Sequence, residues 1–493
     1  MPVFSIIIII ILGYFILIDK SELTTKFYQI FSVDCVVKLF FLQGYFVKIG
    51  NTEVSTAGDV CDLVLLWYAI LIIIGKRNIL QNKVCIRGII FLLVSMLGIF
   101  VEIIMPYEGL LMPAQDETEN WDMYVAGMCT MHQYFPTIID YTNPIRHLVT
   151  YVVILVAFKN IFQYDMFLRA YMSILKYVKY GIYYGWIEFI VKNVIGNTTV
   201  TYLFSGVMFG VNERSIATDA FKRGETFFAL QGFCKEPSHF NVFIFSAVSL
   251  MILGIFIKRF LRHNNIKADI HMTYGISTII SGVVLLSLTG GFSAVWLILI
   301  ITFNTITLRF YEMDTSIMGI ILMYKKTLFI GCLCISILVI VIVSNDYFVG
   351  RIIDAISVLN FIGATGGGFL GLAVGGNQGI GSTIARFISL YEGVNIFISR
   401  PLLGLGYKLQ AVHGDTLTYL INMGVIGFWM FYRLLISSIR EVKYNKLFMF
   451  ITFFIGGLPM IMSAYGLCVY WLLFIEGSML IVKQNIEKLY TEV

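Results

Sequence analysis

Charged residues are scarce in this sequence. Asp, Glu, Lys and Arg make up 13% of its 493 residues, whereas a soluble domain has about 25%. Hydrophobic residues make up 58%, and the mean hydropathy is +0.84. This composition excludes a soluble globular protein. The alternation of apolar and polar residues over about ten positions that a membrane β-barrel requires is absent as well.

Several functional motifs are also absent. No Cys-x-x-Cys occurs, and no His, Cys, Asp and Glu cluster has metal-ligand spacing, so we expect no metal and no cofactor. The Gly-rich run 363–381 contains no Gly-Lys-Ser/Thr, which argues against a phosphate-binding P-loop. No basic patch with interleaved aromatic residues appears, so we expect no nucleic-acid partner.

Long apolar runs recur along the whole chain and are typical of membrane-spanning helices. They predict an all-α, polytopic helical membrane protein with about 12 transmembrane helices, in which residues 1–493 form a single integral membrane domain. The expected spans are Val3–Ile18, Asp59–Ile74, Ile86–Met105, His147–Phe158, Tyr180–Val194, Ser238–Ile257, Met272–Leu288, Ala294–Leu308, Thr327–Val343, Thr416–Tyr432, Phe448–Ser463 and Tyr465–Val482.

The stretch Tyr28–Val47 is apolar but contains Asp34 and Lys38. It fits either an interfacial helix or a poor span, and the sequence leaves both open. If it crosses the membrane, the number of spans rises to thirteen and the N-terminus moves outside.

Lys and Arg gather in alternate connections, such as Lys76–Arg87 and the link after Ile257, which the positive-inside rule places in the cytoplasm. The connection 106–143 is acidic and almost without cations, as expected on the outer face. The rule therefore gives three outer loops, at about 106–143, 197–235 and 344–414, with both chain ends inside. The bilayer is the first expected partner.

The second outer loop and the span before it contain several ionisable residues. Glu188 and Lys192 lie one helical turn apart and can pair. Glu236 precedes Pro237, which suits the first turn of a helix. A carboxylate there fits either a general base or, with Ser238, a plain helix cap. The candidate substrate contacts in this loop and at its end are Arg214, Arg223 and His239.

The third outer loop contains Arg386, Arg400 and His413, followed by an expected helix start at Asp415-Thr416. Arginine binds phosphate with two parallel hydrogen bonds, so arginines beside Gly and Pro turns fit a site for a lipid-linked anion. The plainer interpretation is that they extend to lipid head groups. His413 fits either a surface histidine or a second candidate base.

The two loops together resemble the superfamily of O-antigen polymerases and O-antigen ligases, and within it the Wzy-type polysaccharide polymerases. The similar segments lie between Arg214 and Gly427. They are Arg223-Gly, Glu236-Pro-Ser-His, Ser287-Leu-Thr-Gly-Gly, Arg386 followed by Pro401-Leu-Leu-Gly-Leu-Gly, and His413 followed by Leu417-Thr-Tyr-Leu-Ile-Asn-Met-Gly-Val-Ile-Gly. Gly414 stands where many relatives have Asn.

The resemblance implies a GT-C-like, metal-independent, inverting glycosyltransferase at the outer face of a bacterial plasma membrane. Its substrates would be oligosaccharides linked to undecaprenyl diphosphate, and its partners a chain-length regulator and a flippase. Arg223, Arg386 and Arg400 would stabilise the leaving diphosphate. Either His413 or Glu236 would take the proton of the acceptor hydroxyl.

Two other functions remain open. A ligase of the same superfamily would move finished glycan to another acceptor. A flippase for the same lipid-linked sugar belongs to a different class, the transporters, which usually place ionisable residues in the middle of the membrane and contain internal repeats. We expect the ionisable residues of this chain at span ends and in outer loops, which favours the polymerase.

Overall fold

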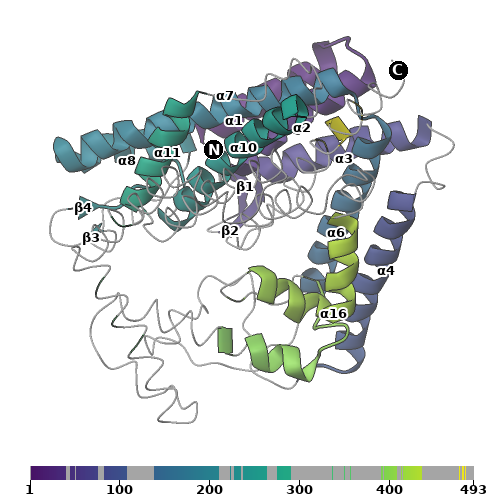
Figure 1. The fold of residues 1–493 in the computed structure, drawn as a ribbon. Coiled ribbons are helices and arrows are strands. Elements are labelled where there is room, and N and C mark those ends of the chain that lie inside the picture. Colours follow the sequence, from purple (N-terminus) through teal and green to yellow (C-terminus); the bar gives the residue numbers. More distant parts are fainter. Residues whose placement is uncertain are drawn as a thin grey trace.

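The computed structural model describes residues 2–39, 45–49, 52–75, 83–107, 138–209, 222–223, 227–234, 237–263, 275–289, 393–407 and 415–435, with a few single positions besides. This part of the chain is mostly helical (Figure 1). Its first elements are α1 (Val3–Gly13), the π-helix η1 (Tyr14–Ile18), α2 (Leu23–Leu39), β1 (Tyr45–Ile49), β2 (Thr52–Thr56), α3 (Ala57–Gly75), α4 (Lys83–Ile104) and α6 (Ile138–Asn160). Its later elements are α7 (Tyr164–Phe189), the π-helix η3 (Ile190–Val194), α8 (Thr198–Phe209), β3 (Lys222–Arg223), β4 (Phe227–Phe228), α10 (Pro237–His263), α11 (Ile276–Thr289) and α16 (Asp415–Leu435).

Two antiparallel hairpins, β1–β2 and β3–β4, add to the expected helices. The first leads directly into α3, whose N-terminus is closed by a reciprocal cap. The hydroxyl and backbone N–H of Thr56 both donate to Oδ2 of Asp59 at 2.9 Å, and the N–H of Asp59 donates back to the Thr56 hydroxyl at 3.3 Å. The pair satisfies N–H groups that a helix start otherwise leaves without partners.

The helices form two groups. In the upper part of Figure 1, α2 packs against α3 and α7, and α10 packs against α7 and α11. Below them, α4 packs against α6 and α16. The chain passes between the groups through α3, which contacts both α2 and α6.

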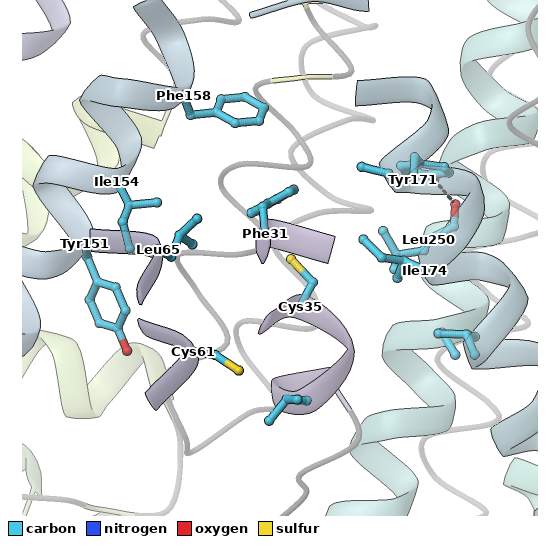
Figure 2. Packing of buried hydrophobic residues seen from close by; sticks show 14 of the residues in the cluster. Phe31, Cys35, Cys61, Leu65, Tyr151, Ile154, Phe158, Tyr171, Ile174 and Leu250 are labelled. Carbon is cyan, nitrogen blue, oxygen red and sulfur yellow. Dashed lines mark hydrogen bonds between the residues drawn. The ribbon is translucent and has the colours of Figure 1, made fainter. Parts of the chain in front are cut away.

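The core between α2, α3, α6, α7 and α10 is rich in aromatic residues (Figure 2). Phe31 of α2 and Phe158 of α6 are fully buried with their ring centroids 5.7 Å apart. The hydroxyl of Tyr171 on α7 donates a hydrogen bond to the carbonyl oxygen of Leu250 on α10. This bond gives a buried polar group its partner inside an otherwise apolar contact.

Small residues allow α7, α10 and α11 to approach one another closely. A Cβ on Gly185 of α7 would lie 2.6 Å from Leu285 of α11, and one on Gly282 of α11 would lie 2.6 Å from Val248 of α10. Close backbone approach at small residues is typical of helix packing in membranes, where dispersion replaces the hydrophobic effect.

A buried ionic cluster joins α2 to α3. Lys38 forms an ion pair with Asp62, lies 3.9 Å from Asp34, and has its Nζ 5.5 Å from the ring centroid of Tyr151 on α6. Asp34 is fully buried and Asp62 nearly so. Lys38 lies in the last turn of α2 and Asp62 in the second turn of α3, so the cluster joins the end of one helix to the beginning of the next.

The ends of several helices differ from the expected spans. α6 begins at Ile138 rather than at His147, and the helix includes Pro144. α7 begins at Tyr164 rather than at Tyr180, so the basic residues expected in a cytoplasmic link lie on the helix itself. The expected outer loop 197–235 includes α8 and the β3–β4 hairpin.

Two of the described helices are long and apolar enough to cross a membrane, Ala57–Gly75 and Ile86–Ile104. Both coincide with expected spans. The expected spans Ala294–Leu308 and Phe448–Ser463, and nearly all of Thr327–Val343 and Tyr465–Val482, lie outside the described residues.

The buried cluster leads to a prediction about stability. We expect Lys38→Met to lower the Tm of the purified protein strongly, because loss of one partner of a buried ion pair leaves an uncompensated charge and costs about 3 kcal/mol. The matched control is Lys26→Met on the same helix, since Lys26 is only half-buried and takes no part in the cluster. Equal Tm values for the two variants would show that the cluster contributes nothing to stability.

Candidate substrate site in two loops

Of the residues expected to bind or react with substrate, Arg400 has a described side chain. For Arg223 in β3 and His239 in α10, the structure describes the backbone. Arg214, Glu236, Arg386 and His413 lie outside the described residues.

Arg400 follows a helical stretch, residues 393–399, and its guanidinium lies against the end of α4. Its Nη2 donates to the carbonyl oxygen of Met105 and lies 4.0 Å from Oε2 of Glu102. The side chain is 21% exposed, so part of its donor set still faces outward. The result is a cation fixed at the end of an apolar helix.

Glu102 is a residue that the sequence analysis missed. Its side chain is 2% exposed, and its Oε1 accepts the N–H of Tyr107 at 2.7 Å. Its Oε2 is buried with no hydrogen bond among the described residues and faces Arg400. A single glutamate near the end of the apolar run Ile86–Met105 was the available signal.

The turn after Arg400 fits into a break in α16. At Gly424 the backbone leaves the helix, with φ 61° and ψ −175°. The N–H groups of Leu405 and Gly406 donate to the carbonyls of Ile421 and Asn422, at 2.8 and 2.9 Å. In return, the N–H groups of Val425 and Ile426 donate to the carbonyls of Pro401 and Leu402, at 2.8 and 3.1 Å.

Glycine is required on both sides of this contact. Gly404 has φ 69°, and a Cβ there would lie 2.5 Å from the backbone of Asn422. A Cβ on Gly424 would lie 2.2 Å from the carbonyl oxygen of Leu402. The Pro401-Leu-Leu-Gly-Leu-Gly segment and the glycine of α16 are therefore complementary halves of one backbone contact, which fixes the position of Arg400.

The chain just before His413 is fixed to the same assembly. The Thr418 hydroxyl donates to the Val412 carbonyl at 2.9 Å and accepts the Val412 N–H at 3.2 Å. Val412 also belongs to a small apolar cluster with Ile396, Leu405 and Ile421. The residue next to His413 in sequence thus packs with the residues that flank Arg400.

The β3–β4 hairpin, which includes Arg223, is held by the π-helix η3. Arg223 pairs with Phe227, and the next residue, Phe228, forms two hydrogen bonds with the Asn193 side chain. The Asn193 amide nitrogen donates to the Phe228 carbonyl at 3.1 Å, and its oxygen accepts the Phe228 N–H at 2.7 Å.

A buried carboxylate at the end of α7 holds the segment that leads toward Glu236. Glu188 pairs with Lys192, as the sequence analysis expected. Its two oxygens also accept the N–H groups of Gln231 at 3.1 Å and Gly232 at 2.6 Å. The turn requires Gly232, which has φ 59° and lies against the Phe240 ring. α10 then begins at Pro237, as expected.

Cys234 lies in the same turn and is fully buried. Burial raises the pKa of its thiol well above the usual value, and the negative charge of Glu188 adds to the effect. A thiol kept protonated in this way is a poor nucleophile. The described contacts therefore give Cys234 a packing role.

The two loops are positioned by different elements: α4 and α16 hold Arg400, while α7 and η3 hold the hairpin and the turn before α10. No protein-family model matches this sequence, and no curated protein or solved structure was found to be similar to it. The functional argument therefore depends on the residues and geometry of the chain itself.

The Glu188 contacts lead to a second prediction. In Glu188→Gln an NH₂ group replaces one acceptor oxygen, so at least one of the N–H groups of Gln231 and Gly232 loses its partner. A hydrogen bond to a charged group contributes about 2 kcal/mol, so we expect amide hydrogen exchange of residues 229–234 to accelerate about thirtyfold. Glu22→Gln, a change at an exposed residue, is the control. Unchanged exchange in Glu188→Gln would exclude Glu188 as the residue that holds this turn.

Proposed function

We propose that the chain is a polysaccharide polymerase at the outer face of a bacterial plasma membrane. It would transfer a growing glycan from undecaprenyl diphosphate to a single lipid-linked repeat unit. The proposal includes about 12 spans in a GT-C-like arrangement, with a chain-length regulator and a flippase as partners. The observation that supports it most is the fixed, partly exposed guanidinium of Arg400 at the end of an apolar helix.

The chemistry of the proposed reaction explains why such a cation would be useful. Breaking the bond between sugar and diphosphate leaves negative charge on the phosphate oxygens. A guanidinium already held in place stabilises that charge without reorganising during the reaction. Glu102 would act as a positioning residue, because it lies behind Arg400 rather than at the reacting atoms.

One-step displacement also requires a base for the acceptor hydroxyl. His413 and Glu236 remain the two candidates. Val412, which precedes His413, is fixed beside the Arg400 turn, and this proximity in the chain favours His413. One-step attack would invert the anomeric centre.

The Lys38 cluster favours a second candidate, a flippase for the same lipid-linked sugar, since buried ionisable residues are typical of transporters. The cation of the cluster, Lys38, however lies in the last turn of α2, whereas Asp62 lies in the first half of α3. The cation is thus at a helix end and not in the middle of a helix, which keeps the polymerase as the first proposal.

The decisive experiment is a size profile of lipid-linked and surface glycans in cells without this protein. Single repeat units at the outer face with no polymer would support the polymerase. Long polymer retained on its lipid would indicate a ligase. Lipid-linked units retained at the inner face would indicate a flippase and overturn the proposed site.

Arg400 variants test the site more directly. We expect Arg400→Gln to reduce polymer about 100-fold, the usual order for loss of one group that stabilises transition-state charge. Glu102→Gln should fall between Arg400→Gln and wild type, because Arg400 keeps its bond to the Met105 carbonyl. Arg433→Gln is the control, since Arg433 stacks on Trp429 in the last turn of α16. Normal polymer from a well-expressed Arg400→Gln protein would contradict the assignment.

The identity of the base is a separate prediction. We expect His413→Ala to abolish polymer and Glu236→Gln to leave a measurable fraction. The measurement is polymer length and amount at matched protein levels. Normal polymer from His413→Ala would transfer the role to Glu236.

A further inference from the structure

A cavity of about 550 Å³ lies between α1, α2 and α7, among the described residues. α1 lines it with apolar side chains, including Ile7, Ile8 and Ile11. α2 and α7 contribute polar groups, including Gln29 and Arg169. The cavity is therefore amphipathic, and its cation comes from the first turns of α7.

The exposed face of α7 changes character along the helix. Arg169 and Lys176 come first, the exposed tyrosines 177, 180 and 183 follow with the half-buried Lys179 among them, and Ile187 of α7 and Ile190 of η3 come last. This order of cation, aromatic ring and aliphatic side chain matches the passage from the head-group layer into the hydrocarbon of a bilayer. It places Arg169 at the level of lipid phosphates.

The charged residue of the cavity lining is Arg169. No carboxylate among the described residues pairs with Arg169. The cavity thus presents an apolar wall beside a guanidinium that suits a phosphate.

We propose that this cavity binds one anionic membrane glycerophospholipid. Its phosphate contacts Arg169, and an acyl chain lies along Ile7, Ile8 and Ile11. Basic pockets between helices on the cytoplasmic side of a membrane are known to select anionic lipids. The inference depends on membrane insertion and not on the glycan chemistry.

The test is lipid binding by the purified full-length protein after removal of bound lipid. Native mass spectrometry would measure binding of phosphatidylglycerol, phosphatidic acid and phosphatidylcholine. We expect one phosphatidylglycerol per chain and at least tenfold weaker binding of phosphatidylcholine. Arg169→Gln should weaken phosphatidylglycerol binding at least tenfold, while Arg169→Lys retains most of it. The control is Lys179→Gln, a change on the same helix outside the cavity lining.

Equal binding of zwitterionic and anionic lipids, or normal binding by Arg169→Gln, would overturn the proposal. So would displacement of phosphatidylglycerol by undecaprenyl phosphate at equal concentration, because the cavity would then be a substrate site. Absence of any bound lipid would overturn it as well. None of these readouts depends on polymer formation, so they are independent of the proposed function.

Discussion

The geometry of the third loop depends on one requirement, that every backbone N–H and C=O group away from water must have a partner. Breaking α16 at Gly424 frees two carbonyls before the break and two N–H groups after it. The Arg400 turn supplies a partner to all four. Arg400 is therefore placed by backbone hydrogen bonds rather than by its own side-chain contacts alone. A loop attached in this way can hold a cation steadily.

Buried charge is distributed according to the same requirement. Glu188 is surrounded by Lys192 and by two backbone N–H groups, so each oxygen has a donor. At the junction of α2 and α3, the two carboxylates of Asp34 and Asp62 share one cation, Lys38. In both places the contacts of a buried charge connect segments that are distant in sequence. The charge keeps its partners only while these segments stay in their relative positions.

The mostly helical character of the described residues and the two helices long enough to cross a membrane could be predicted from the sequence, since long apolar runs leave little choice of structure. The starts of α10 at Pro237 and α16 at Asp415 also followed from local capping signals. The start of α7 could not be predicted. Its basic residues resemble a cytoplasmic link, and only the packed helix shows that they share one exposed face. At the candidate site, the Gly-x-Gly turn could be predicted from the sequence. The contact between Arg400 and Glu102 could not, because it joins residues about 300 positions apart and no local sequence pattern indicates it.

The π-helix η3 has a consequence for how the second loop tolerates change. A π-helical turn contains one residue more than an α-helical turn, and Asn193 lies within it, next to Phe228. Deleting one residue before Asn193 in this stretch would let α7 continue as an ordinary helix, and Asn193 would keep nearly the same direction, because an α-helix turns further per residue than a π-helix. A deletion within α7 itself would instead rotate every later residue by about 100° around the axis. The stretch Ile190–Val194 is therefore the place where this helix can lose one residue without turning Asn193 away from the hairpin.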